Sequence, residues 1–427
     1  MGGGYDAVGQ LGMLGNDALR AAPSTSGCSP RGFSFRLTRC RASRMPLTSA
    51  LTVTGALAIR LGGTVTPVPK GGADVSVPHG ASAGERASAQ PDAAAMEKLR
   101  AAVGLQIADE DLLRNLAEGL QDVERLLHEV VRSDVKAVND AASHLVDAGG
   151  KRFRPLFTLL ASQFGTGGRD AVVTAAASVE LVHLATLYHD DVMDEATMRR
   201  GAESVNARWD NTIAILTGDF LFAHASRLVA DLGTDAARII AETFSELVTG
   251  QMRETVGPTG DDDPVEHYLS VIGQKTGSLI ATAGRFGGML SGAPDEYVDA
   301  LRRFGDIIGA AFQISDDVID IDSPSTELGK SQGTDLREGV RTLPMLYAIA
   351  DKSTNPRLVE LLAGPVTEDD LVQEALDLLR ESSGLERAKI TLADYARRAR
   401  TELAALPASP ARDACESVAD YLVARTR

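Results

Sequence analysis

Apolar residues recur at intervals of three and four along most of the chain after about residue 110. That spacing places them on one face of an α-helix. Similar stripes predict further helices over residues 172–187, 213–229, 239–248, 301–321 and 371–379. The first stripe consists of Leu112, Leu113, Leu116, Leu120, Val123, Leu126, Leu127, Val130 and Val131.

Helix-breaking residues separate these stripes, at residues 165–168, Gly257, Pro258, Pro294, Pro324 and Pro344. We find no alternating strand pattern of useful length and no repeat of roughly 20 to 50 residues. Aromatic residues form only 4% of the chain, which suits a helical protein better than a β-sandwich. The pattern predicts an all-α fold, a large single-domain bundle of roughly ten or more helices.

Residues 1–95 differ from the rest. They are rich in Gly, Ala, Ser, Thr and Pro, lack a sustained helical period and contain more Arg than acidic residues around residues 31–44. This composition predicts a disordered extension preceding a catalytic domain at residues 96–427. Two interpretations of this segment are a transit peptide and untranslated sequence that was included by a wrong start codon. We favour the second, with Met96 as the true start, because Met96 directly precedes the periodic region.

The formal net charge of the 427-residue chain is -16, which disfavours a nucleic-acid partner because phosphates would be repelled. The three cysteines have no metal-like spacing and indicate a reducing, cytoplasmic setting. We expect no apolar run long enough to span a bilayer, and at most peripheral membrane contact.

Two acidic motifs share one spacing, Asp190-Asp191-x-x-Asp194 and Asp316-Asp317-x-x-Asp320, and each ends an apolar helix. On a helix, carboxylates four residues apart share a face and repel, and a divalent cation relieves that repulsion. One such motif could be a solvated acidic face. Two of them at the ends of buried helices predict facing metal sites around a diphosphate. The acidic residues 261–263 lie in a Gly/Pro loop, and we interpret them as surface charge.

A basic motif, Gly149-Gly150-Lys151-Arg152-Phe153-Arg154-Pro155, and the pair Arg199-Arg200 complete the constellation. Glycines let backbone N–H groups approach an anion, and Arg offers forked donors to phosphate oxygens. Either basic run alone is more often a solvated face. Together with the two acidic motifs they favour diphosphate binding.

With these motifs the sequence resembles the trans-isoprenyl diphosphate synthases of the long-chain type. The matching segments keep the family's order and cover the chain from about residue 112 to its end. They are GGKRFRP (149–155), HDDVMDEATMRRG (189–201), GQ (250–251), KT (275–276), FQISDDVID (312–320) and GKSQGTDLREGVRTLP (329–344). The resemblance implies an isoprenoid synthase-like bundle with a central cavity.

The resemblance also implies roles for individual residues. Two or three Mg²⁺ ions would be held by Asp190, Asp191 and Asp194 and by Asp316, Asp317 and Asp320. Arg199 would support the allylic diphosphate and Lys330 the second metal site. Together with Lys275, the first five of these carboxylates and Arg199 would form the catalytic set.

Both substrates have expected contacts. The resemblance assigns isopentenyl diphosphate to Lys151, Arg154, His183 and Arg200, and the allylic substrate to Lys275, Thr276 and Gln313. A lone His on an apolar helix is more often a core residue, but His183 lies two turns before Asp190 on the same face, which favours a ligand.

The chemistry implied is cleavage of the allylic C–O bond, with the leaving charge stabilised by Mg²⁺, Lys and Arg. The allylic cation must be kept from water, which explains an apolar cavity. Isopentenyl diphosphate then attacks the cation, and in the family the proton passes to the diphosphate. No Ser or Cys nucleophile is required. Family members are commonly homodimers.

Product length is predicted from Ala185 and Thr186, one turn before Asp190. In the family, aromatic residues there stop growth early. Small residues imply a deeper tunnel and a product of hexaprenyl to decaprenyl size, destined for a quinone side chain. Ala185 could instead merely pack against another helix, with a bulky residue elsewhere giving a geranylgeranyl product.

Other functions make distinct demands. A class I terpene cyclase would lack both the GGKRFRP segment and the second Asp-Asp-x-x-Asp motif, and both are present. A non-catalytic subunit that needs a partner chain would be expected to have lost one acidic motif, and neither is lost.

Overall fold

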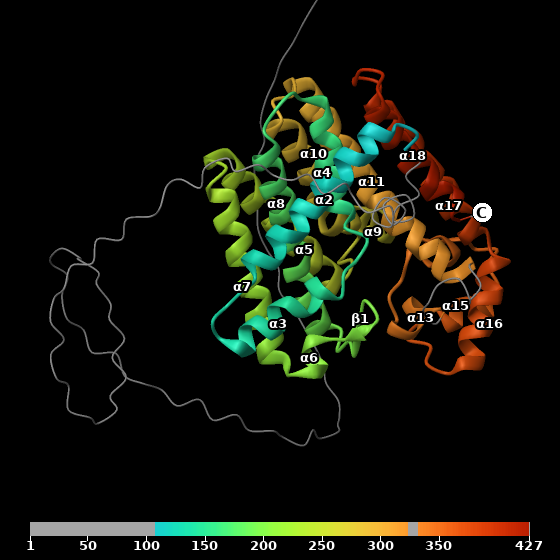
Figure 1. Cartoon of the computed structure of the whole chain (residues 1–427). Coiled ribbons are helices and arrows are strands. Elements are labelled where there is room, and N and C mark those ends of the chain that lie inside the picture. The colour runs from blue at the N-terminus through green and yellow to red at the C-terminus, as the bar shows by residue number, and fades with distance from the viewer. Residues whose placement is uncertain (1–106, 323–331, 427) are drawn as a thin grey trace, which may run out of the picture. The chain divides into compact units, whose positions relative to one another are not determined.

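The computed structural model describes residues 107–322 and 332–426, which fall in the unit Ala83–Arg427. These residues form helices and one two-stranded antiparallel hairpin, in which Met198 pairs with Glu203 (Figure 1). The elements are α2 (Glu110–Val130), α3 (Lys136–Asp147), α4 (Phe153–Ala161), the 3-10 turn η1 (Ser162–Phe164), α5 (Arg169–Met193), β1 (Met198–Arg199), β2 (Ala202–Glu203), α6 (Val205–Arg208), α7 (Asn211–Ala230), α8 (Thr234–Val256), α9 (Pro264–Ile272), the π-helical turn η2 (Gly273–Gly277), α10 (Ser278–Leu290), α11 (Asp295–Asp322), α13 (Thr334–Glu338), α14 (Leu343–Ala350), α15 (Pro356–Leu361), α16 (Asp369–Arg380), α17 (Ser383–Leu403) and α18 (Pro410–Ala424).

The helix starts follow from capping side chains. Asp109 accepts a hydrogen bond from the Leu112 N–H at 2.8 Å at the start of α2. Asp210 does the same for Ile213 at 2.9 Å at the start of α7. Such caps satisfy N–H groups that have no partner within the helix. The predicted all-α bundle is confirmed, and each predicted stripe lies within a helix, except that the first extends one residue beyond α2, to Val131.

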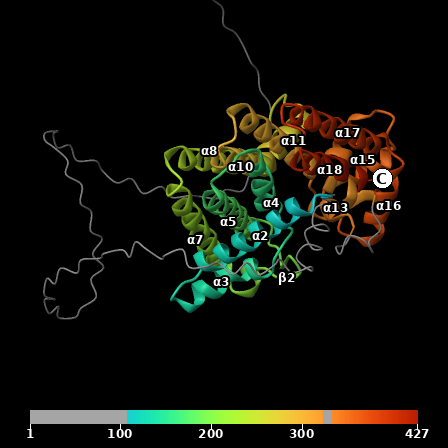
Figure 2. The same cartoon turned by 45° about the horizontal axis from the view of Figure 1, so that its top comes forward.

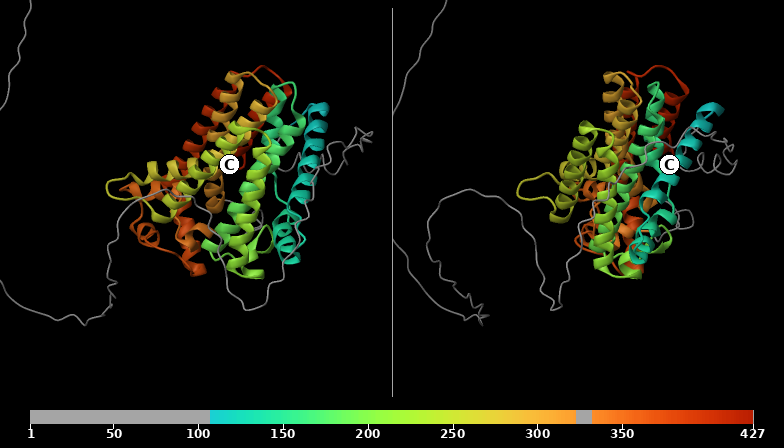
Figure 3. Two further views of the ribbon diagram at one scale, coloured as in Figure 1. Left: turned by 90° about the vertical axis from the view of Figure 1, so that its left-hand side faces the viewer. Right: turned by 60° about the vertical axis from the view of Figure 1, so that its left-hand side comes forward.

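Two long helices organise the bundle. α5 packs against α2, α4, α7 and α10, and α11 packs against α10, α17 and the η2 turn. Figure 2 shows α5 among these neighbours, and Figure 3 shows α17 running beside α11. Glycines allow α10 and α11 to approach closely, because a Cβ at Gly305 would lie only 2.7 Å from the Ile280 carbonyl oxygen. The two acidic motifs lie at the C-terminal ends of α5 and α11.

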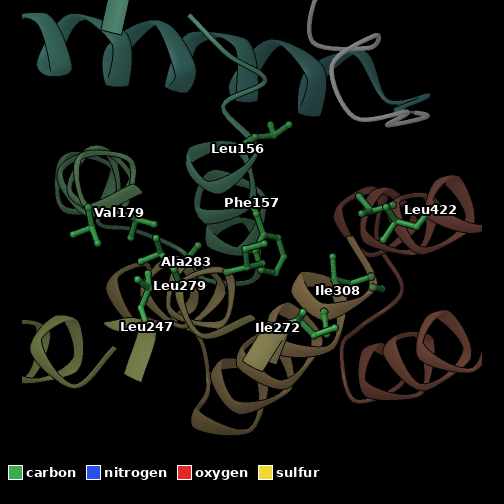
Figure 4. Close-up of a cluster of buried hydrophobic side chains, with 14 of the residues drawn as sticks. Leu156, Phe157, Val179, Leu247, Ile272, Leu279, Ala283, Ile308 and Leu422 are labelled. Atoms are coloured by element: carbon green, nitrogen blue, oxygen red, sulfur yellow. The ribbon is translucent and has the colours of Figure 1, made fainter. Parts of the chain in front are cut away.

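The core between these helices is built from aliphatic and aromatic side chains. Phe157 of α4 packs with Phe304 of α11, their ring centroids 5.5 Å apart. Figure 4 shows Phe157 among Leu279 and Ala283 of α10 and Ile308 of α11. Burial of each large side chain contributes about 1.5–3 kcal/mol. This packing fixes the helix ends that carry the polar motifs.

One sequence-based expectation was wrong. By length and composition, α5 and α7 could each cross a bilayer. However, 72% of the most apolar 18-residue window of α5 is buried inside the bundle, compared with 39% for α7. A core helix passes the same test of length and hydropathy, and α5 is such a helix. α7 leaves more of its apolar surface exposed.

Three sequence-based predictions lie outside the described residues. They are the disordered segment 1–95, the helix breaker Pro324 and the supporting cation Lys330. The domain boundary between residues 95 and 96 also stays a prediction.

Candidate active site

A cavity of about 430 Å³ opens between α4, α5, α8, η2, α10 and α11. It collects residues that are far apart in the sequence. The predicted site residues that line it are Lys151, Arg154, His183, Thr186, Asp190, Arg199, Arg200, Lys275, Thr276, Gln313 and Asp316. Side chains of both acidic motifs and of the basic motif therefore face the same space.

The first acidic motif ends α5, and its three carboxylates have different environments. Asp190 lines the cavity, and burial raises its pKa to about 6, against the opposing effect of Lys275. Asp191 is fully buried. One of its oxygens accepts a hydrogen bond from Arg199 Nε at 2.6 Å, and the other, Oδ2, has no partner. Asp194 caps the helix end and is exposed.

The second acidic motif belongs to the last turns of α11. Asp316 lines the cavity and accepts a hydrogen bond from Arg425 at 2.7 Å. Asp317 is buried and accepts from the Tyr268 hydroxyl and from Gln313 Nε2, the latter at 3.3 Å. Burial raises the pKa of Asp317 to about 7.

The carboxylate of Asp320, the last in that motif, accepts from two backbone N–H groups at the start of α13. These are the N–H of Thr334 at 3.2 Å and that of Asp335 at 3.4 Å. Burial and the nearby carboxylates of Asp317 and Asp320 raise the pKa of Asp335 to about 8. Asp335 thus adds a further carboxylate to the second motif.

These carboxylates fit divalent cations. A buried oxygen without a partner on Asp191, and raised pKa values at Asp190 and Asp317, indicate negative charge that the protein alone does not neutralise. In the described part of the chain, no three acidic, His or Cys side chains converge closely enough to enclose an ion by themselves. Mg²⁺ suits such a donor set because it takes one or two carboxylates together with phosphate oxygens and water.

The same cavity is also lined by cations. Arg154 is half-buried, its buried Nε has no partner, and burial lowers its pKa to about 10. Burial and the neighbouring Arg154 and Arg200 lower the pKa of His183 well below its ordinary value, so its imidazole is neutral. Lys151 is exposed at the cavity edge. A guanidinium with a buried, unsatisfied donor is the group that a phosphate oxygen would complete.

Lys275 and Thr276 lie in the η2 π-helical turn between α9 and α10. π-helical turns inside α-helices are frequent at functional sites. Lys275 Nζ is 2.5 Å from Glu254 Oε2, which anchors the cation beside Asp190. The local widening of the helix at this turn brings both residues to the cavity.

The predicted tunnel positions differ in their surroundings. Thr186 lines the cavity just described and also a second cavity of about 590 Å³ between α5, α7 and α8. Asp190, Leu247 and Gln251 line both cavities as well. Ala185 is fully buried and lines neither of the two. Thr186, rather than Ala185, therefore borders both cavities.

Sequence reasoning missed several residues of the site. Asp335 lies in the matched segment 329–344, so its acidic side chain could have been found there. Tyr268 and Arg425 carried no comparable signal, because only the fold brings them to Asp317 and Asp316. Arg152, in contrast, belongs to the basic motif but is 7% exposed and engaged by Glu124 and Glu180. The exposed residues 261–263 were correctly interpreted as surface charge.

The raised carboxylate pKa values predict that the metal-free protein loses stability as the pH rises from about 6.5 to about 8, above which both carboxyls are ionised in the folded and unfolded states. Asp317 and Asp335, with folded-state pKa values of about 7 and about 8 against an ordinary 3.8, bind protons more strongly folded than unfolded. Stability is therefore lost as the pH rises through these values. Asp351, with a pKa of about 2, is ionised in both states throughout this range. The lowered pKa of His183 affects stability only below its ordinary value of 6.5.

Thermal unfolding in EDTA, monitored by circular dichroism, measures this effect. The melting temperature should fall by a few degrees across the range, and Mg²⁺ should reduce the fall. A flat or rising melting temperature in EDTA would contradict the assignment of two protonated carboxyls beside the second motif.

The chain is similar to several known proteins. Residues 135–379 match the family model described as polyprenyl synthetase. The chain is 55% identical over 324 residues to nonaprenyl diphosphate synthase of Mycobacterium tuberculosis, covering 75% of this chain and 97% of that protein.

Two solved structures are similar in fold. One is geranylgeranyl pyrophosphate synthase from Corynebacterium glutamicum, complexed with calcium and isoprenyl diphosphate. Its TM-score is 0.68 at 49% identity, covering 75% of this chain and 99% of that one. The other is a decaprenyl diphosphate synthase from Rhodobacter capsulatus, with a TM-score of 0.67 at 35% identity, covering 74% of this chain and 99% of that one.

Proposed function

Because the chain belongs to the polyprenyl synthetase family and is a trans-prenyltransferase, we propose that it builds a long all-trans polyprenyl diphosphate. It would add isopentenyl diphosphate units head to tail to an allylic diphosphate, reaching hexaprenyl to decaprenyl size. The observation that carries the proposal is one cavity lined by carboxylates of both acidic motifs, by cations of both basic segments and by a neutral His183.

The cavity residues divide the work between two diphosphates. Lys151, Arg154 and Arg200 would bind isopentenyl diphosphate, and Arg154 has the free donor for it. The allylic diphosphate would lie between Asp190 and Asp316, near Lys275. Mg²⁺ ions, two or three in number, held by the two acidic motifs would stabilise negative charge on its oxygens.

The reaction then needs little proton transfer by the protein. The allylic C–O bond breaks, and its electron pair leaves with the diphosphate. Lys275 stabilises the charge that develops there. The double bond of isopentenyl diphosphate forms the new C–C bond, and a proton passes to the diphosphate. The neutral His183 donates a hydrogen bond without adding charge, and the apolar side chains of Leu187, Leu279 and Phe312 exclude water.

The second cavity supports a long product. It is lined mainly by apolar side chains, including Val192, Phe244 and Met252, and it adjoins the first cavity at Thr186. The names of the Mycobacterium and Rhodobacter relatives point in the same direction. We propose that the product supplies the side chain of a quinone.

The assembly and location are proposals as well. Exposed apolar side chains on α7 and α8, Ile215, Leu216, Val248, Met252 and Val256, support a homodimer that covers them. Cysteine usage supports a cytoplasmic location. The hydrophobic prenyl product would bring the enzyme into peripheral contact with a membrane at most.

The test is product analysis of the purified protein with isopentenyl diphosphate, farnesyl diphosphate and Mg²⁺. We expect a ladder that ends at one long prenyl diphosphate and disappears when EDTA is added. A ladder that stops at geranylgeranyl diphosphate would favour the geranylgeranyl synthase alternative, as in the Corynebacterium relative.

Two further outcomes would contradict the proposal. Elongation only after a second chain is added would indicate a subunit that needs a partner. Release of a hydrocarbon in place of a longer diphosphate would indicate a class I terpene cyclase.

A further inference from the structure

A buried carboxylate lies beneath the cationic part of the candidate active site. Glu180, on α5, is 1% exposed and lines the cavity. Its Oε1 accepts a hydrogen bond from Arg152 Nη1 at 2.9 Å and lies 3.6 Å from Arg200 Nη2. Arg152 and Arg200 belong to different basic segments of the sequence, so one carboxylate joins the two segments.

Both arginines have an unfavourable backbone conformation. Among the described residues, the non-glycine residues with positive φ are Arg152 at 47°, Glu195 at 50° and Arg200 at 54°. A left-handed conformation is costly for a residue with a Cβ and persists only where the surroundings hold it. Two of these three strained residues are the partners of Glu180. Strain at both ends of one buried ion-pair network indicates a role in arranging the cations.

The two arginines depend on Glu180 to different degrees. Arg152 is also held by Glu124, with its Nε 2.6 Å from Glu124 Oε1, and by the Val146 carbonyl oxygen at 2.9 Å. Within the described part of the chain, Arg200 has no second carboxylate partner, and it donates hydrogen bonds to the carbonyl oxygens of Leu145 and Gly149. At 3.6 Å its attraction to Glu180 is mainly that between two charges. Arg200 should therefore be the more sensitive of the two to loss of that charge.

We propose that Glu180 is a positioning residue for isopentenyl diphosphate binding, an inference that rests on the proposed function. Its charge holds the Arg200 guanidinium against the Gly149–Gly150 turn, where a Cβ at Gly150 would lie 2.9 Å from Arg200 Cζ. The turn and the guanidinium thus fix each other's place. Lys151 and Arg154 follow that turn, so the three cations keep one arrangement around the diphosphate.

Loss of the Glu180 charge should change the affinity for the diphosphate in opposite directions, depending on whether Glu180 positions Arg200 or only adds negative charge. Removing a negative charge makes the cavity more positive, and a sum of charges alone predicts tighter diphosphate binding. Positioning predicts weaker binding, because Arg200 is released from its strained conformation. The two accounts therefore predict opposite changes.

The experiment compares Glu180→Gln with the wild type. Glutamine keeps an oxygen that can accept from Arg152 and loses the charge that attracts Arg200. We expect the KM for isopentenyl diphosphate to rise about tenfold, since charge-assisted contacts are roughly twice as strong as neutral ones. The kcat at saturating substrate and the KM for farnesyl diphosphate should change less than about twofold. A merely structural role would lower the active fraction and kcat instead.

A second measurement and two variants complete the test. Calorimetric titration with isopentenyl diphosphate in EDTA should show the same loss of affinity without turnover. Glu124→Gln, which removes the other carboxylate on Arg152, is the matched control and should leave both KM values unchanged. If Glu180→Gln does not fold, Glu180→Asp, which keeps the charge but withdraws it by one methylene, should raise the same KM.

An unchanged or lower KM for isopentenyl diphosphate in the folded Glu180 variant, with an active wild type, would overturn the positioning role. A wild type that neither binds isopentenyl diphosphate in EDTA nor elongates farnesyl diphosphate would instead overturn the proposed function.

Discussion

Replacing Asp190 by alanine is expected to lower kcat by about three orders of magnitude or more, because it removes the carboxylate placed to hold a metal ion against the leaving diphosphate. Asp190 lines the cavity beside Lys275 at the end of α5. Asp191 does not make up for the loss, because it offers a single oxygen, Oδ2, while its other oxygen accepts from Arg199. Elongation assays at saturating Mg²⁺ and substrates measure this loss.

The same substitution should leave the fold intact. Burial raises the pKa of Asp190 to about 6, so its ionised form costs the folded state free energy at pH 8. Removing the carboxyl should therefore keep or raise the melting temperature in EDTA. Asp261→Ala is the matched control, because Asp261 is an exposed acid outside the cavity, and its kcat should equal that of the wild type. Near-normal turnover in Asp190→Ala would remove the metal assignment.

The fold could be predicted because its signal is local. Apolar residues three and four positions apart predict a helix without any information from distant parts of the chain, as the stripe starting at Leu112 does for α2. The acidic and basic motifs are also local, since four residues fix one helix face and two glycines shape one turn. Local sequence patterns therefore predicted both the helical bundle and the residue types that line its cavity.

The partners within the site could not be predicted, because they depend on packing between distant segments. Arg425 contacts Asp316 across 109 positions and Tyr268 contacts Asp317 across 49. The same limit explains the tunnel. Ala185 and Thr186, one turn before Asp190, point in different directions because they are adjacent on a helix. Their surroundings depend on the packing of α7 and α8, which leaves Thr186 at a cavity and encloses Ala185. The basic motif also gave no sign that Arg152 donates a hydrogen bond to Glu124.

Thr186→Phe is expected to shift the product from a long chain to a short one, because a ring at this position fills the junction of the two cavities. Thr186 lines both of them, and its hydroxyl donates to the His183 carbonyl oxygen at 2.8 Å, which leaves its methyl group to border the apolar space. The substitution leaves the carboxylates and cations of the first cavity unchanged, so the first condensations should be preserved. Chromatography of the dephosphorylated products gives the chain-length distribution directly.

Two companion variants decide whether blocking is the cause. Thr186→Val keeps the size of the side chain and should keep the product long. Ala185→Phe places the same ring one residue earlier, in a fully packed position, where overpacking costs about 1–3 kcal/mol. Ala185→Phe should lower the melting temperature and should leave the product longer than that of Thr186→Phe. A long product from Thr186→Phe would mean that the growing chain does not pass from the first cavity into the second, and that another residue ends its growth.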